Sequence, residues 1–286
     1  NAFRLIKGWE VANCEQPKSA KQAINWFENK IRKAITEIDE SYSKYRISEA
    51  LMGTYKLVWD DFCSWYLEMV KPNYGSPMDL VTYNKTTEQL EKILKLLHPF
   101  MPFLSEEIWH LIDDRKEDII IAEWPKTGAI NKQLLSDFEN TTEVVAGIRT
   151  IRKEQNIANK NQLELLVINN QKATNDLDAI IAKLGNISTI NTTKEKPTGA
   201  FSFMVKSNEY FIPLGDNIDV ESEIEKLQKE LDYTKGFLKS VEGKLSNERF
   251  VNNAPKQVVV NERNKMTDSK AKIEILEIKI KDLVNA

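Results

Sequence analysis

The sequence predicts a mainly α-helical protein: an antiparallel helical bundle, then a small α/β unit, then a C-terminal antiparallel coiled-coil hairpin. Three observations predict it. Apolar residues recur at helical spacing through the first 125 residues, short runs typical of strands follow, and two heptad rows close the chain. The 286 residues are enough for about two domains of roughly 150 residues each. We expect three parts, with boundaries at 1–125, 126–217 and 218–286.

Residues 1–125 are predicted to form the helical bundle, in antiparallel order. Its helices are marked by four sets of apolar residues: Ile24, Phe27, Ile31, Ala34, Ile35 and Ile38; Ile47, Leu51, Val58, Phe62, Trp65, Tyr66 and Met69; Leu90, Ile93, Leu94 and Leu97; Ile108, Trp109 and Ile112. Ser19, Thr86 and Ser105 are the expected N-caps. The aromatic residues Trp59, Phe62, Trp65 and Tyr66 are expected in the core because of their helical spacing.

Residues 126–217 change in pattern and predict the α/β unit. Helices are expected at 143–154 and 177–184, and a strand at 163–168. Two further runs, 201–205 and 210–214, are rich in aromatic and β-branched residues and predict paired strands.

Residues 218–286 predict a coiled-coil hairpin. Two rows step by alternating four and three residues: Val220, Ile224, Leu227, Leu231, Thr234, Leu238, Val241 and Leu245; then Val259, Glu262, Met266, Ser269, Ile273, Leu276, Ile280 and Leu283. A short connection separates them, in which Asn253 is an expected cap and Pro255 an expected first-turn residue. Two rows joined in this way predict antiparallel arms, each about 40 Å long.

Charge in the hairpin is distributed unevenly. Residues 219–232 hold six acids and two bases, a net charge of −4, whereas residues 235–272 hold nine bases and four acids, a net charge of +5. The whole chain carries −3, so any contact with nucleic acid must use a local basic surface. The basic end of the hairpin favours phosphate binding, and a chance asymmetry on a solvated face is the alternative.

The sequence offers little catalytic chemistry. His98 and His110 are the two histidines, and neither is expected to have acids or cysteines at metal-ligand spacing. A capping or packing role is expected for His98. The chain holds no glycine-rich phosphate loop, and Cys14 and Cys63 suggest reduced thiols rather than a disulfide framework. We therefore expect no catalytic residue, metal site or cofactor. No apolar run long enough to span a bilayer is seen, and the first residues already lie in an apolar periodic segment, so we expect a fragment of a longer cytoplasmic protein.

Several motifs resemble the valyl-tRNA synthetases over essentially the whole chain. Residues 44–50 (KYRISEA), 59–68 (WDDFCSWYLE), 96–109 (LLHPFMPFLSEEIW) and 122–125 (AEWP) are similar to anticodon-domain motifs that the valyl, isoleucyl and leucyl enzymes share. Residues 148–157 (IRTIRKEQNI) resemble the segment after that bundle. Residues 243–250 (GKLSNERF), 253–255 (NAP) and 258–263 (VVVNER) resemble the valyl enzyme's coiled-coil arm.

The resemblance implies a tRNA-binding piece without the catalytic and editing domains. ATP would then be used by the full-length ligase only, and the expected partner is tRNA(Val), with no DNA, no membrane and a monomeric chain. The expected anticodon-binding residues are Arg4, Lys7, Trp9 and Arg46, although a salt bridge to a bundle glutamate is equally expected for Arg46. The expected phosphate-binding residues of the arm are Lys235, Lys239, Lys244, Arg249, Lys256, Arg263 and Lys265. A protein-interaction module with a coiled-coil arm, and the equivalent region of an isoleucyl or leucyl enzyme, remain the alternatives.

Overall fold

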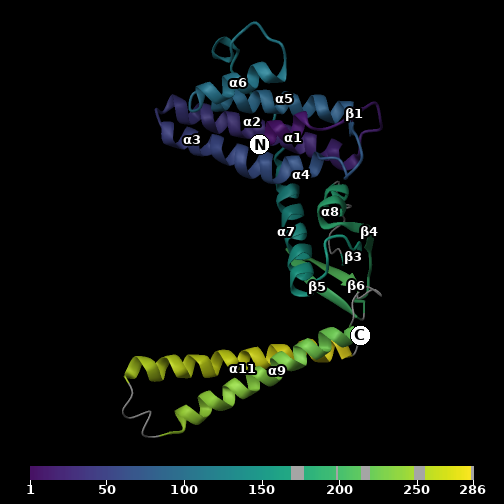
Figure 1. Cartoon of the computed structure of the whole chain (residues 1–286), viewed down its shortest axis with the longest axis vertical. Helices are drawn as coiled ribbons and strands as arrows, with labels where there is room; N and C mark the ends of the chain where they lie inside the picture. Colours follow the sequence, from purple (N-terminus) through teal and green to yellow (C-terminus); the bar gives the residue numbers. More distant parts are fainter. Residues whose placement is uncertain (169–176, 198, 214–219, 248–254, 285–286) are drawn as a thin grey trace. The chain divides into compact units, whose positions relative to one another are not determined.

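The computed structural model describes residues 1–168, 177–197, 199–213, 220–247 and 255–284 (Figure 1). The chain divides into two compact units. The first unit is Asn1–Arg149 with Gln171–Ile187, and the second is Thr150–Asn170 with Ser188–Ala286. Most described residues are helical and the strands are short, which confirms a mainly α fold with a small α/β part.

The first unit is the helical bundle. Its helices are α1 (Ala2–Lys7), α2 (Lys18–Ser43), α3 (Ile47–Lys56), the π-helix η1 (Leu57–Tyr66), α4 (Leu67–Val70), α5 (Leu80–Leu97), α6 (Pro102–Ile112), the 3-10 helix η2 (Ile119–Ile121), the start of α7 (Lys132–Glu154) and α8 (Asp178–Gly185). The strands β1 (Val11–Ala12) and β2 (Met78–Asp79) pair in parallel. Helix α2 packs against α3, η1, α4, α5 and α8, which makes it the centre of the bundle (Figure 1).

Rings fill the core of the bundle. Phe27 of α2 stacks on Tyr66, with ring centroids 4.6 Å apart, and Tyr66 stacks on Phe62. Trp26 stacks on Phe138 of α7 at 3.9 Å. The predicted inward face of α2 is confirmed, because Ile31, like the other isoleucines of that set, is buried. Aromatic burial of this kind dominates core stability.

Trp59 departs from the prediction for the aromatic set. Phe62 and Tyr66 are buried and Trp65 is half-buried, but the Trp59 side chain is 60% exposed and stacks on Tyr55. The segment from Leu57 to Tyr66 is a π-helix, in which side chains advance by a different angle per residue than in an α-helix. The α-helical spacing used for the prediction therefore placed Trp59 on the wrong face.

The three predicted N-caps are wrong. Helix α2 begins at Lys18, one residue before Ser19. Helix α5 begins at Leu80 and is capped by Asp79, whose Oδ1 accepts a hydrogen bond from the Thr82 amide. Thr86 lies inside α5. Ser105 lies inside α6, where its hydroxyl donates to the Met101 carbonyl, because Pro102 already occupies the first turn.

The second unit contains a four-stranded sheet in the order β4-β3-β6-β5. Its strands are β3 (Leu163–Ile168), β4 (Ile187–Thr192), β5 (Ala200–Val205) and β6 (Asn208–Pro213). Strand β6 pairs antiparallel with both β3 and β5. The predictions for β3, β5 and β6 are confirmed, whereas β4 was not predicted. Helix α7 begins at Lys132, eleven residues before the expected 143.

The hairpin consists of α9 (Val220–Leu245) and α11 (Lys256–Val284), which pack along each other (Figure 1). Every row position whose side chain is described is buried or half-buried, from Ile224 to Leu245 and from Val259 to Ile280. The two heptad rows therefore form the seam between the helices, as predicted. Pro255 lies just before α11, and Asn253 is outside the described residues. Within the described part of the chain, no helix is both long enough and apolar enough to cross a membrane.

Candidate nucleic-acid interface

Three of the four predicted anticodon-binding residues lie together on α1 and directly after it. Arg4 is exposed. The Lys7 ammonium donates to the Leu111 carbonyl at the end of α6 at 3.0 Å and lies 5.6 Å from the centre of the Phe3 ring. Trp9 is half-buried against the hydrophobic core. Arg4 is thus free to meet a phosphate, Lys7 is partly engaged, and Trp9 has a packing role of its own.

Arg46 lies in a different part of the bundle. It is the N-cap residue of α3 and makes an exposed ion pair with Glu49, 3.4 Å long. The turn that carries it is held near the α5–α6 connection, because Tyr42 stacks on Phe100. Helix α1 instead packs beside Tyr83 and the N-terminal half of α5. The structure therefore does not bring Arg46 together with the α1 residues, and the salt-bridge alternative describes its contact.

One exposed aromatic residue was not predicted as a candidate from the sequence. Tyr74 is fully exposed in the connection between α4 and β2, where Gly75 takes a positive φ of 75°. This connection leads into β2, and the Met78 amide donates to the Glu10 carbonyl at 2.7 Å, directly after Trp9. Tyr74 stands between Pro72 and Gly75, in a loop where it has no place in the core. An aromatic residue in such a loop was the signal in the sequence that could have identified it.

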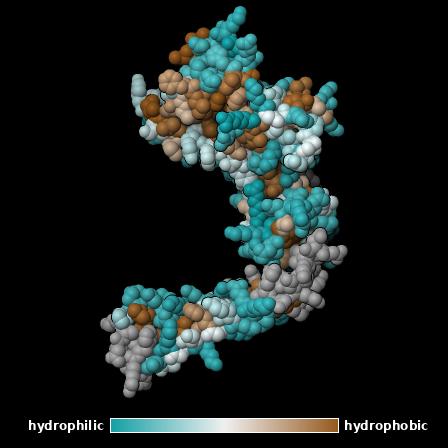
Figure 2. All heavy atoms as spheres, in the orientation of Figure 1, coloured by the Kyte–Doolittle hydropathy of each residue, from teal (hydrophilic) through white to brown (hydrophobic). Residues whose placement is uncertain are grey.

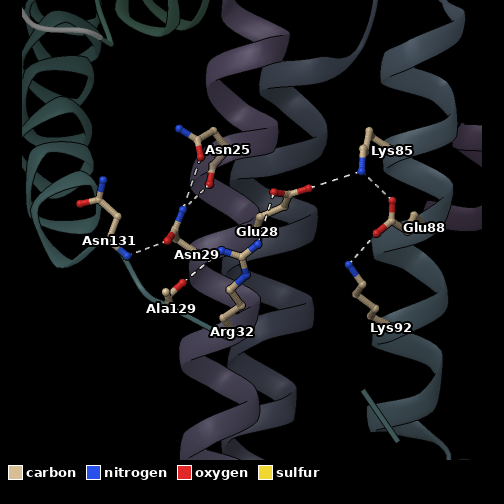
Figure 3. A network of polar contacts seen from close by, with 9 residues as sticks. All are labelled: Asn25, Glu28, Asn29, Arg32, Lys85, Glu88, Lys92, Ala129 and Asn131. Carbon is tan, nitrogen blue, oxygen red and sulfur yellow. Dashed lines mark hydrogen bonds and ion pairs between the residues drawn. The ribbon is translucent and has the colours of Figure 1, made fainter. Parts of the chain in front are cut away.

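A polar groove runs between α2, α5 and residues 126–129. Its open cavity has a volume of about 520 Å³. Figure 3 shows its network: the Arg32 guanidinium donates to the Ala129 carbonyl at 3.1 Å, and the Asn29 side chain accepts from the Asn131 amide at 2.7 Å. These bonds attach the chain after the bundle to α2.

Two glutamates and four basic side chains line this groove, so it keeps an excess of positive charge, although the glutamates pair with three of the four bases. Glu88 accepts hydrogen bonds from Lys85 at 2.9 Å and Lys92 at 2.8 Å (Figure 3). Burial raises the pKa of Glu88, but these two bonds outweigh it and hold the pKa below its usual value. The hydrogen bond to Glu88 in turn raises the pKa of Lys85, which also lies 3.7 Å from Glu28. The groove therefore acts first as a structural network.

Five of the seven predicted phosphate-binding residues have described side chains, all of them exposed, and three of these five are paired. Lys235 meets Glu277 of the other helix at 2.7 Å. Lys244 and Lys265 both meet Glu262, at 3.5 and 2.7 Å. Among the described residues of the arm, Lys239 and Arg263 make no ion pair. Arg249 and the side chain of Lys256 lie outside the described residues.

The two histidines differ in their surroundings. His98 follows α5, and its Nδ1 shares a hydrogen bond of 2.8 Å with the Ser105 hydroxyl, which is the packing contact expected of it. The expectation that neither histidine has acids at ligand spacing is wrong for His110. Glu106 and Asp118 both approach His110 Nε2, because the loop after α6 turns back toward the helix.

Two family models match the chain. Residues 25–167 match the anticodon-binding domain of tRNA ligases, and residues 219–284 match the tRNA binding arm of valyl tRNA synthetase. The helical bundle, with α2 at its centre, thus defines the class: the chain carries the anticodon-binding domain of a tRNA ligase. The hairpin decides among the members of that class, because the arm is matched by the valyl model, which disfavours the isoleucyl and leucyl alternative.

The chain belongs to the valyl-tRNA synthetase family. It is 54% identical over 286 residues to the valine–tRNA ligase of Christiangramia forsetii, covering 99% of this chain and 33% of that protein. It is 48% identical over 280 residues to the valine–tRNA ligase of Parabacteroides distasonis, and the match covers 97% of this chain and 32% of that protein. It is 33% identical over 280 residues to the valine–tRNA ligase of Brucella suis, and the match covers 94% of this chain and 31% of that protein. The chain spans about a third of the length of these relatives.

Proposed function

We propose that this chain is the tRNA-binding portion of a monomeric, cytoplasmic valine–tRNA ligase. Its bundle reads the anticodon loop of tRNA(Val), and its arm holds the tRNA backbone. A catalytic part outside these residues joins valine to the tRNA with ATP, so no residue of this chain takes a catalytic role. The observation that carries the proposal is the pair of matched regions, an anticodon-binding domain and a tRNA binding arm in one chain. We retain 1–125, 126–217 and 218–286 as its functional divisions.

The anticodon loop is assigned to the surface formed by α1 and the α4–β2 connection. Unpaired bases are recognised by stacking on aromatic rings and by hydrogen bonds to their edges. Tyr74 supplies an exposed ring, Arg4 an exposed guanidinium and Lys7 an ammonium. Trp9 supports this surface from below, since it packs on the core. Arg46 lies at another part of the bundle and is assigned a structural ion pair.

The arm is assigned to the sugar-phosphate backbone. Contacts with phosphates orient a nucleic acid without reading its sequence. Lys239 and Arg263 are the first candidates, because neither would have to leave a carboxylate partner before it met a phosphate. Lys235, Lys244 and Lys265 must exchange a glutamate for a phosphate, so each contributes less. Arg249 and Lys256 add two further basic residues to the same part of the sequence.

Hydroxyl-radical footprinting of a tRNA(Val) transcript tests the two assignments together. The full chain is expected to protect riboses of the anticodon loop and a second, separate stretch of backbone. The variant Tyr74→Ala is expected to lose only the first protection, and the double variant Lys239→Gln with Arg263→Gln only the second. Protection at a single site that both variants weaken equally would contradict the division of labour between the bundle and the arm.

One observation favours an additional protein-contact surface on the bundle. The exposed residues Ile47, Leu51, Met52, Tyr55 and Trp59 share one face of α3 and η1. Figure 2 shows apolar residues gathered over the end of the bundle that carries α3, whereas the hairpin is mostly hydrophilic. A patch of this kind marks a contact surface. The interaction-module alternative therefore applies to α3 rather than to the arm, and crosslinking from position 59 in the longer protein would test it.

A further inference from the structure

We propose that Glu106, His110 and Asp118 form a binding site for a divalent transition-metal ion of the Zn²⁺ class. The site lies at the end of α6 and in the loop that follows, and it goes beyond the proposed RNA-binding function because it requires no RNA. One imidazole nitrogen and two carboxylate oxygens lie there within 4.8 Å of one another.

The spacing of the three atoms suits a tetrahedral ion. His110 Nε2 lies 3.1 Å from Glu106 Oε1 and 3.3 Å from Asp118 Oδ1. Ligands at roughly 2.0–2.2 Å from zinc are separated by roughly 3.3–3.6 Å along the edges of a tetrahedron. A small outward movement of the Glu106 carboxylate therefore makes room for the ion, and no backbone has to move.

The orientation of the imidazole is already fixed. His110 Nδ1 lies 3.1 Å from the Arg115 carbonyl, which can only accept, so Nδ1 carries the proton. Nε2 then faces the two carboxylates. A metal-bound histidine typically donates its second ring nitrogen to a carbonyl or carboxylate in this way, which fixes the ring and its tautomer. The Glu106 carboxylate is likewise positioned from outside, since its Oε1 accepts from the Ile119 amide at 3.0 Å.

The loop that brings Asp118 to His110 is anchored at several points. The Arg115 guanidinium pairs with Glu91 of α5 and lies 3.8 Å from the centre of the Trp109 ring. The Trp109 indole donates to the Glu117 carbonyl at 3.1 Å. The site is therefore organised before an ion arrives, so little ordering entropy opposes binding.

The donor set selects the class of ion. Imidazole suits zinc, cobalt, nickel and copper, whereas calcium and magnesium prefer oxygen ligands throughout. The side chains of Glu106, His110 and Asp118 are 30%, 36% and 66% exposed, which leaves a coordination position open to solvent. The competing explanation is an imidazolium ion paired with two carboxylates, in which a proton occupies the place of the metal.

A bound ion would tie the loop after α6 to the helix. This is the same end of α6 at which the Leu111 carbonyl accepts from Lys7 of α1. The expected effect is a more rigid support for α1, which requires no role in the chemistry of the ligase.

Metal titration of the full chain tests the proposal. All proteins carry Cys14→Ser, because this exposed thiol could bind the same ions. Titration with Co²⁺, followed by visible absorption, and with Zn²⁺, followed by calorimetry, is expected to show one saturable site. His110→Ala should abolish it, and Asp118→Asn should weaken it at least about 10-fold. The matched control His98→Ala removes the other histidine and should leave it unchanged.

Two further readouts separate the ion from the proton. Zn²⁺ should raise the Tm of the chain with Asp118 intact and not that of Asp118→Asn, whereas Mg²⁺ should change neither. Unaltered binding in His110→Ala, equal loss in His98→Ala, or no saturable site at millimolar Zn²⁺ would overturn the proposal and leave an imidazolium ion pair.

Discussion

The Lys183 ammonium donates to the Lys71 carbonyl at 2.7 Å, and this bond joins α8 to the end of α4. The two residues are 112 positions apart in the sequence. Burial, followed by the charge of Lys71, lowers the pKa of Lys183 to about 8, although Glu68 opposes the shift. The first unit thus holds a lysine that is still charged at pH 7 but releases its proton near pH 8, well below the range of an ordinary lysine.

This lysine should make stability depend on pH in the alkaline range. The unfolded chain holds the Lys183 proton up to about pH 10.4, while the folded chain releases it near pH 8. Between these values the unfolded state binds more protons, so stability rises with pH. Below pH 8 the full cost of burying the charged Lys183 side chain is present. Lys183→Met should remove it and stabilise the first unit at pH 7 by on the order of 1–2 kcal/mol.

Urea unfolding followed by tryptophan fluorescence checks this at pH 7, 8, 9 and 10. The difference in the free energy of unfolding between the variant and the parent chain should shrink as the pH rises. A constant difference would mean that Lys183 keeps its proton in both states.

The buried hydroxyl pair of Tyr66 and Thr86, 2.9 Å apart, should couple in a double-mutant cycle. Burial raises the pKa of Tyr66 well above its usual value, which keeps the phenol protonated. Thr86→Val leaves that phenol without a partner and should cost about 1–3 kcal/mol. Tyr66→Phe should cost about 1 kcal/mol, and the double variant less than the sum of the two.

A surface pair serves as the control for this cycle. Thr36 and Thr127 also share a hydrogen bond of 2.9 Å, but both are exposed. Thr36→Val should change the free energy of unfolding by less than about 0.5 kcal/mol. Additive effects of Tyr66→Phe and Thr86→Val would contradict the coupling.

Glu262 should limit the stability of the hairpin. This carboxylate is buried on the seam, where a hydrogen bond from Lys265, with further help from Lys244, lowers its pKa. Its contribution is present above the unfolded pKa and is lost as the pH falls through the folded one. Glu262→Leu should protect the amides of α9 and α11 more strongly from hydrogen exchange, because an apolar seam residue replaces a buried ion pair. Glu262→Ala should weaken the protection of the same amides. Equal protection in Glu262→Leu and Glu262→Ala would contradict this prediction.

Lys239 and Arg263, two basic side chains of the arm without an ion pair among the described residues, should set the salt dependence of RNA binding. Lys239→Gln with Arg263→Gln should reduce the slope of log affinity against log salt by about 2, equally for all tRNAs. The matched control is Lys270→Gln with Lys272→Gln, because these lysines pair with Glu242 and Glu230 and also lie in the arm. If the control changes the slope as much as the test variant, ion pairing does not decide which basic side chains of the arm contact phosphates.

Tyr74 should contribute to the affinity for tRNA(Val). Tyr74→Ala removes a stacking surface worth about 1–3 kcal/mol per base and should lower the affinity for tRNA(Val) roughly 5- to 100-fold without altering the salt slope. Tyr45, which is 90% exposed at the α2–α3 turn, provides the control. Equal losses for Tyr74→Ala and Tyr45→Ala would argue against a specific stacking site.

Sequence reasoning succeeded where a single local pattern decides the structure. The seam positions from Leu231 to Leu276 followed from the heptad period, because a two-helix hairpin offers no other way to bury them. The strands β3, β5 and β6 followed from dense apolar and aromatic runs. Strand β4 lies at the edge of the sheet and presents mostly polar residues, so it carried no such signal.

Sequence reasoning failed where a side chain has a long-range partner. The Thr86 hydroxyl bonds to Tyr66 instead of capping a helix. Asp118 lies beyond the end of α6 and reaches His110 through a loop whose path depends on Arg115, so helical spacing could not reveal the contact. The connection that carries Tyr74 leads into β2, which pairs with β1, a contact between segments 67 residues apart at Val11 and Met78.

Salt-dependent binding of the chain to tRNA(Val) tests the central claim most directly. The measurement compares a native transcript, the same transcript with a swapped anticodon, and an unrelated tRNA, from low to moderate salt. We expect the tightest binding to the native transcript and a steep, similar salt slope for all three. Equal affinities at every salt concentration would contradict anticodon reading by the bundle, and affinities that do not respond to salt would contradict phosphate binding by the arm.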